Sequence, residues 1–230
     1  MSRFQTTRWS LIAAARDHPS QARNALEQLC GAYRPPVLAF VRHSGYSQAD
    51  AEDLTQTFFL RFVERGWYGQ ADPERGRFRS LLLTALRRFL LDQRDAEHAA
   101  KRDVACKVEF DELTQPDDGG ESPEQAFTRV WMGTVIGHAY ARLQAEWERA
   151  GKREQFEQLS ALLAERADSA ELHALASRLG LRPNTVAVQA HRMRQRLRQL
   201  VRLELLQTVG SSEALEQELA ELRTALPDAP

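Results

Sequence analysis

The chain contains little of what marks secreted, membrane-spanning or metal-binding proteins. Its 230 residues include two cysteines, Cys30 and Cys106, which lie in separate segments and form no CxxC pair. A disulfide framework and a structural zinc site are therefore not expected. The N-terminus lacks the apolar core of a signal peptide, and no run is long enough to span a bilayer. We expect a cytoplasmic protein that has no membrane contact, no bound metal and no cofactor.

A large excess of one charge is also missing. The 31 Lys and Arg residues nearly balance the 32 Asp and Glu residues, for a net charge of -1. The total charge thus does not indicate a polyanionic partner, although local patches matter more than the total. A hydrophobic content of 43% with 27% charged residues fits one or two domains with cores of their own.

Runs that alternate polar and apolar residues are absent too, whereas apolar residues recur at spacings of three and four almost throughout. This period predicts an all-α fold. The segment Asp103–Pro123 is acidic and interrupted by glycine and proline, as linkers are. We therefore predict a helical domain over residues 1–102, an acidic linker over 103–123 and a second helical domain over 124–230.

Several helix boundaries can be predicted. Pro35 and Pro36 should interrupt or kink a helix that would resume after them. Ser47 should cap the next helix. Gly180 should end another helix at its C′ position. A serine should also cap an acidic helix over 212–226, which either caps its domain or restrains DNA binding; the sequence favours capping.

The stretch DAEDLTQTFFLRF, residues 50–62, packs acids, threonines and phenylalanines into one helix. Its helical period places Ala51, Leu54, Thr55, Phe58, Phe59 and Phe62 on an inner stripe. The outer face carries Asp50, Asp53, Thr57, Arg61 and Glu64. Because no histidine, nucleophile or metal-binding cluster accompanies these carboxylates, we predict that the chain is not an enzyme. The outer face is either solvated or a docking surface.

The stretch GRFRSLLLTALRRFLLDQRD, residues 76–95, is rich in arginine and follows aromatic residues at 67 and 68. Cations that track phosphates, beside rings that stack on bases, suit single-stranded nucleic acid. Aromatic residues beside a loop also commonly belong to a core, so this pattern alone is weak.

The stretch LHALASRLGLRPNTVAVQAHRMRQRLRQL, residues 172–200, predicts a helix-turn-helix. A short apolar helix ends at a glycine turn, and no acid interrupts the sequence from Arg182 until Glu204. Such a basic second helix suits the major groove of duplex DNA. The alternative is an ordinary helical hairpin with a solvated basic face.

In this order, the three stretches resemble the bacterial RNA polymerase sigma factors of the extracytoplasmic-function type, within the sigma-70 family. The resemblance covers about residues 6 to 205 and implies two small helical domains, sigma region 2 and region 4, joined by a linker. It also implies a role in promoter recognition and transcription initiation. The partners would be core RNA polymerase, through its β′ clamp helices and β flap, and promoter DNA.

The resemblance also implies a role for particular residues. Contacts with core polymerase would come from Asp50, Glu52, Asp53, Gln56 and Arg61. The minus-ten element would be melted and bound by Trp67, Tyr68, Arg75, Arg77, Phe78, Arg79, Arg87 and Arg88. The minus-thirty-five element would be read as duplex by Arg182, Asn184, Thr185, Val188, Gln189, Arg192 and Arg196. The acidic linker would run through the RNA exit path.

The chain departs from the family at two threonines. The usual pattern EDLVQEVF reads EDLTQTFF here, so Thr55 replaces an apolar residue and Thr57 replaces an acid. Loss of that charge should weaken docking by about 1 kcal/mol. A phosphoryl group on Thr57 would restore it. We predict that a Ser/Thr protein kinase phosphorylates Thr57, and Thr55 is the second candidate. The alternative is that threonine at position 57 is a polar substitution without functional effect.

Two other classes of protein remain compatible with the sequence. One is a free-standing helix-turn-helix regulator that binds duplex DNA by itself. The other is a helical adaptor that binds only protein. The arginine- and aromatic-rich N-terminal half favours the sigma factor, because a dimerising sensor has no need of it.

Overall fold

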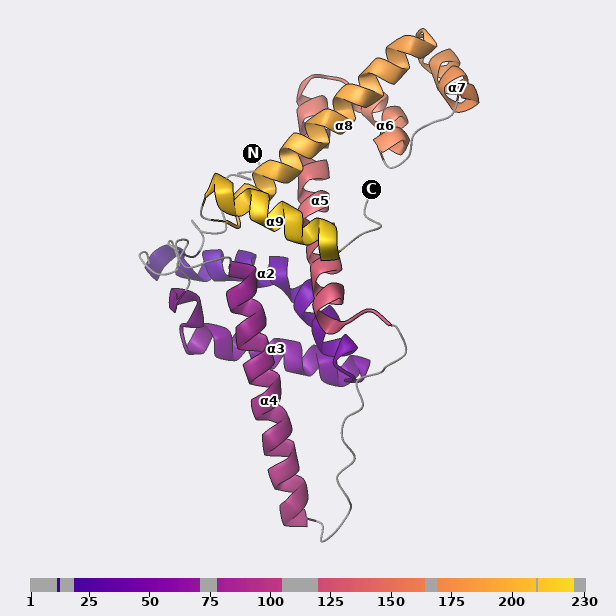
Figure 1. The fold of residues 1–230 in the computed structure, drawn as a ribbon. Helices are drawn as coiled ribbons and strands as arrows, with labels where there is room; N and C mark the ends of the chain where they lie inside the picture. The colour runs from indigo at the N-terminus through magenta and orange to yellow at the C-terminus, as the bar shows by residue number, and fades with distance from the viewer. Residues whose placement is uncertain are drawn as a thin grey trace. The chain divides into compact units, whose positions relative to one another are not determined.

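In a computed structural model of the chain, the structure describes residues 12, 19–70, 78–104, 120–163, 169–209 and 211–225. Within these residues all regular structure is helical (Figure 1), which confirms the predicted all-α class. The α-helices are α2 (Pro19–His43), α3 (Gln48–Glu64), α4 (Phe78–Val104), α5 (Pro123–Arg149), α6 (Arg153–Leu159), α7 (Ser169–Leu179), α8 (Pro183–Leu206) and α9 (Ser212–Ala225). Short 3-10 helices follow α3 and α6, namely η1 (Trp67–Gln70) and η2 (Ser160–Leu163). Among the described helices, none is both long and apolar enough to cross a membrane.

The chain divides into two compact units. Unit 1 holds the described residues of Met1–Trp131 and Gln207–Leu226, and unit 2 holds those of Met132–Leu206. The first boundary falls inside α5, and α9 belongs to unit 1. The sequence had placed this last helix with the C-terminal domain. Residues 105–119, most of the predicted linker, lie outside the described residues.

Helix α2 continues through two consecutive prolines. Pro35 and Pro36 both lie inside its 25 residues, although each proline removes one helical hydrogen bond. Core packing on both sides of the pair offsets this loss, since Tyr33 and Val37 are completely buried. Of the two predicted outcomes, an interruption or a kink, the interruption therefore does not occur.

Aromatic side chains form the core of unit 1. The ring of Phe58 lies 5.8 Å from that of Phe62 and 5.6 Å from that of Phe89, between ring centroids. Phe62 in turn contacts Phe78 at 6.2 Å, and Phe78 contacts Tyr33 at 5.2 Å. These edge-on and tilted contacts join α2, α3 and α4. Four residues of the predicted inner stripe of α3 are buried, namely Ala51, Thr55, Phe58 and Phe62, whereas Leu54 and Phe59 are half-buried.

Unit 2 has a separate core built from α5, α6, η2, α7 and α8. Its buried residues include Leu143, Phe156, Leu175, Val186 and Met193. The buried positions 186, 190 and 193 of α8 recur at spacings of three and four, as the sequence predicted. One stripe of α8 thus faces the core, which leaves its other sides for polar contacts.

Candidate nucleic-acid interface

The N-terminal part of α3 presents an acidic face. Ser47 caps the helix, as predicted: its Oγ accepts a hydrogen bond from the backbone N–H of Asp50 at 3.2 Å. The same hydroxyl donates to Asp50 Oδ2 at 2.7 Å. Asp50, Glu52, Asp53 and Gln56 are all exposed. A carboxylate near a helix N-terminus is favoured by the helix dipole, so the fold stabilises negative charge here.

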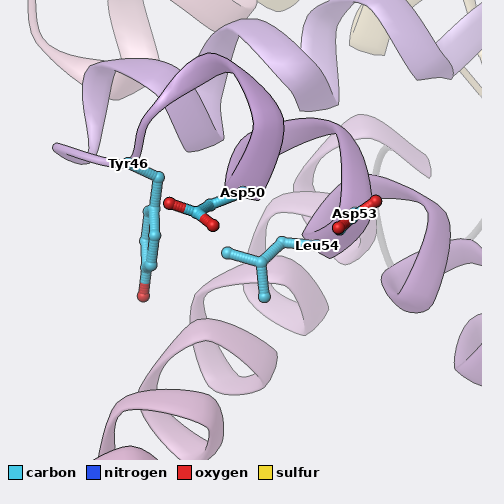
Figure 2. A pocket seen from close by; sticks show the side chains of 4 residues that line it. All are labelled: Tyr46, Asp50, Asp53 and Leu54. Atoms are coloured by element: carbon cyan, nitrogen blue, oxygen red, sulfur yellow. The ribbon is translucent and has the colours of Figure 1, made fainter.

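A shallow hollow lies beside this acidic face, lined by Tyr46, Asp50, Asp53 and Leu54 (Figure 2). Figure 2 shows the Tyr46 ring facing the Asp50 carboxylate, with the Leu54 side chain beside them. Arg94 of α4 holds Tyr46 in place: its guanidinium carbon lies 5.6 Å from the ring centroid, and its Nε donates to the Tyr46 hydroxyl at 3.3 Å. The hollow is therefore lined by an aromatic ring, an aliphatic side chain and two acidic residues.

The two threonines of α3 differ in exposure. Thr55 is completely buried, and its hydroxyl oxygen has no hydrogen-bond partner in the structure. Thr57 is half-buried and lies one helical turn from both Asp53 and Arg61. Arg61 is half-buried as well, with its guanidinium 5.3 Å from the centroid of the Phe89 ring. A group added to Thr57 would thus lie within reach of a cation.

The aromatic residues predicted to bind the minus-ten strand pack against the core in this structure. Trp67 contacts the rings of Phe58 at 6.5 Å and Phe62 at 6.2 Å. Tyr68 contacts Phe62 at 6.5 Å. Phe78 is 1% exposed, so its ring is not available for stacking on a base in this arrangement. Trp67 and Tyr68 remain half-buried.

The arginines predicted for the same role divide into three groups. Arg75 and Arg77 lie outside the described residues. Arg87 and Arg88 are exposed, and Arg87 binds Glu124 of α5 through its Nη2 at 2.7 Å. Arg79, in contrast, is 8% exposed. A guanidinium so covered can contact DNA only after its present neighbours move.

In unit 2, α7 and α8 are joined by a tight turn at Gly180. This glycine has a φ of 64°, a left-handed conformation that favours glycine. The N–H of Leu181 donates to Ala176 O at 2.9 Å, and that of Gly180 to Ser177 O at 3.4 Å. This hydrogen-bond pair satisfies the last carbonyls of α7 and places Gly180 at C′, as predicted.

The residues predicted to read duplex DNA lie along α8 and the turn before it. Five of them are exposed: Arg182, Asn184, Thr185, Val188 and Arg192. Two others are engaged within unit 2. Gln189 accepts a hydrogen bond from the Gln155 side chain at 3.0 Å. Arg196 forms a bidentate pair with Glu146, through its Nε at 2.9 Å and its Nη2 at 2.6 Å.

Comparison with known families identifies the segment that contains the acidic face. Residues 29–99 match the family described as Sigma-70 region 2. These residues are a sigma-70 region 2 domain. No curated protein and no solved structure matches the chain. The domain indicates a sigma factor of the sigma-70 family, a non-enzymatic family whose members direct RNA polymerase to promoters.

The region 2 domain contains α3, η1 and most of α2 and α4. It therefore includes every residue predicted to contact core polymerase or the minus-ten element. The sequence did not single out Tyr46 of the hollow, and it assigned Leu54 to the inner stripe. It also gave no role to the C-terminal Glu218, which pairs with Arg79. An aromatic residue directly before the Ser47 cap was the available signal for Tyr46. No local pattern in the sequence could have predicted that Glu218 forms an ion pair with Arg79.

Proposed function

We propose that the chain is an extracytoplasmic-function sigma factor that binds core RNA polymerase and directs it to promoters. The region 2 domain over residues 29–99 carries this proposal. In a complete initiation factor, one domain docks on the polymerase and opens the minus-ten element, while a second module binds duplex DNA. The α7–turn–α8 segment supplies a helix-turn-helix of the kind that fits a major groove.

Docking on the β′ clamp helices is assigned to the acidic face of α3. Asp50, Glu52, Asp53 and Gln56 are exposed together on one helix, where carboxylates can pair with basic side chains of a partner. Arg61 lies farther along the helix at its half-buried edge. The adjoining hollow at Tyr46 and Leu54 would accept an apolar side chain from the same partner.

Single-stranded minus-ten DNA is assigned to η1 and the start of α4. Arg75, Arg77 and Arg88 would neutralise phosphates, and Trp67 and Tyr68 would stack on unpaired bases once the strand binds. Phe78 would support this surface from the core. Arg87 would join after leaving Glu124, a surface pair that holds it only weakly.

Duplex minus-thirty-five DNA is assigned to the N-terminal half of α8. Asn184, Thr185 and Val188 would reach base edges, because residues near the start of a recognition helix do so. Arg182 and Arg192 would bind phosphates or guanine. Gln189 would give up its hydrogen bond with Gln155 to contact DNA, and Arg196 would give up its ion pair with Glu146.

A Ser/Thr protein kinase would activate the factor by modifying Thr57. An exposed or half-exposed hydroxyl is accessible to a kinase, and Thr57 meets this condition whereas the buried Thr55 does not. A phosphoryl group on Thr57 adds nearly two negative charges to the docking face. Arg61, one turn away, would help to hold it.

Transcription with core polymerase on genomic DNA fragments tests this function. We expect transcripts from the phosphorylated chain and from Thr57→Glu, and few from Thr57→Ala or the unmodified chain. Thr84→Glu, which adds a charge at an exposed site on α4, is the matched control and should not activate. Equal transcription by all Thr57 forms would refute the switch. Duplex binding without any polymerase binding would instead favour a free-standing regulator.

A further inference from the structure

Arg79 lies in a closed site made by three helices of unit 1. Its Nη2 is 3.0 Å from Glu218 Oε1 and 3.9 Å from Glu221 Oε2, both on α9. Its Nη1 donates to Thr128 Oγ1 at 3.1 Å, and its guanidinium carbon lies 5.0 Å from the Trp131 ring centroid. The C-terminal helix thus provides the anionic side of the site, and α5 provides the rest.

Glu218 is an unusual residue for its position on α9. Leu215 and Leu222, on the same face of the helix, are each 5% exposed, and Glu218 between them is 1% exposed. A leucine there would bury apolar surface without removing a charge from water, which is costly even for paired ions. If α9 served only to cap unit 1, the buried carboxylate of Glu218 would weaken the packing of the helix. The carboxylate instead makes the docking of α9 depend on an arginine partner, Arg79.

The buried pair is also poorly suited to fix the helix permanently. Arg79 Nε is buried and has no hydrogen-bond partner in the structure. A buried ion pair that leaves a donor unsatisfied adds little net stability, because desolvation cancels much of the attraction. Such a pair sets where the helix docks and still allows it to leave.

Arg79 is the second residue of α4, at the start of the helix to which the proposed function assigns minus-ten DNA. A guanidinium binds a carboxylate or a phosphate with the same planar arrangement of donors. It cannot bind both in this site, since only 8% of the residue is exposed. The carboxylates of α9 therefore occupy the position that a DNA phosphate would take.

We propose that α9 is an autoinhibitory latch, in which Glu218 and Glu221 hold Arg79 until a DNA phosphate replaces them. This proposal rests on the proposed function. The latch opens when the minus-ten strand binds: α9 leaves, Arg79 exchanges carboxylate for phosphate, and Thr128 and Trp131 remain beside it. Free factor would then bind DNA weakly, and the full polymerase–promoter complex would hold α9 away.

The test uses full-length chain, phosphorylated at Thr57 and assembled with core polymerase on a promoter fragment with an unpaired minus-ten region. Glu218→Gln keeps the shape of the side chain and removes its charge. We expect this variant to bind the fragment about tenfold more tightly than wild type. Glu216→Gln, on the exposed side of the same helix, should bind as wild type does. Circular dichroism verifies that both variants fold.

Hydrogen exchange on the wild-type chain gives a second measurement that needs no variant. We expect the amides of residues 212–225 to be protected in the free chain and to exchange faster in the promoter complex. Unchanged protection in that complex, or equal DNA affinity for Glu218→Gln and wild type, overturns the latch alone. Failure of the wild type to bind core polymerase, both unmodified and phosphorylated at Thr57, would overturn the proposed function, and the latch with it.

Discussion

At the scale of single residues, the arginines differ mainly in what they bind within the chain. Arg88, Arg182 and Arg192 are exposed. Arg79 and Arg196 carry the same charge but have carboxylate partners at 3.0 and 2.6 Å. An arginine of the first kind can bind a phosphate at once, whereas one of the second kind must first give up a partner. The number of arginines along a helix thus indicates how many phosphates it can bind. Whether each arginine is free to bind one depends on its carboxylate partners within the chain.

The Glu146–Arg196 pair makes the stability of unit 2 depend on pH. Hydrogen bonds from Arg196, followed by the positive charges of Arg196, Arg149 and Arg142, lower the pKa of Glu146 from its ordinary 4.5. A carboxyl whose pKa is lower in the folded state stabilises the fold above its unfolded pKa. This contribution is present above about pH 4.5 and is lost as the pH falls through the native pKa.

We therefore expect Glu146→Gln to unfold at a lower urea concentration than wild type at pH 7. The difference should begin to shrink below about pH 4.5 and should vanish once the pH falls below the lowered native pKa, because the wild-type carboxylate is then protonated too. The matched control is Glu148→Gln, an exposed residue on the same helix that accepts a hydrogen bond from the neutral Gln144 amide. The control should change the midpoint little. A Glu146→Gln effect of constant size from pH 7 to pH 3 would contradict this account.

At the scale of elements, the turn between α7 and α8 sets the orientation of α8 relative to α7. Gly180 adopts its positive φ in open space, since nothing lies within 4 Å of an added Cβ. An alanine there would meet strain in its own backbone rather than a clash with a neighbour. The turn, and not the side-chain packing around it, thus requires the glycine.

Two glycine substitutions in unit 2 should accordingly have opposite signs. Gly180→Ala should lower the free energy of unfolding by about 1 kcal/mol. Gly133→Ala, at an exposed and uncrowded position inside α5, should raise it by about 0.5–1 kcal/mol. Urea unfolding followed by circular dichroism measures both. The same sign for the two changes would exclude backbone conformation as the cause.

Local features of the elements could be predicted from the sequence, and their long-range partners could not. The Ser47 cap and the Gly180 turn depend on residues within one helical turn, and both predictions are confirmed. The passage of α2 through Pro35 and Pro36 depends on core packing, which outweighs a local preference. The burial of Arg79 depends on a helix 139 positions away in the chain, from 79 to 218. Spacing carries no information about such a pair.

At the scale of the whole molecule, two units with separate cores carry complementary candidate surfaces. The region 2 domain in unit 1 holds the acidic face of α3, and unit 2 holds the basic helix α8. A net charge of -1 gives the free chain little general attraction to DNA. Binding through two modest sites becomes strong only when a partner engages both together. Under the proposed function, core polymerase is that partner.

The affinity of the full-length chain for core RNA polymerase tests the central claim most directly. It should be measured for the unmodified chain, the chain phosphorylated at Thr57, and the phosphorylated Asp53→Asn variant, with Glu154→Gln of unit 2 as the control. We predict that the phosphorylated chain binds, and that Asp53→Asn weakens this binding by about 1 kcal/mol, roughly fivefold. The control should have no effect. No binding in either modification state would contradict the account.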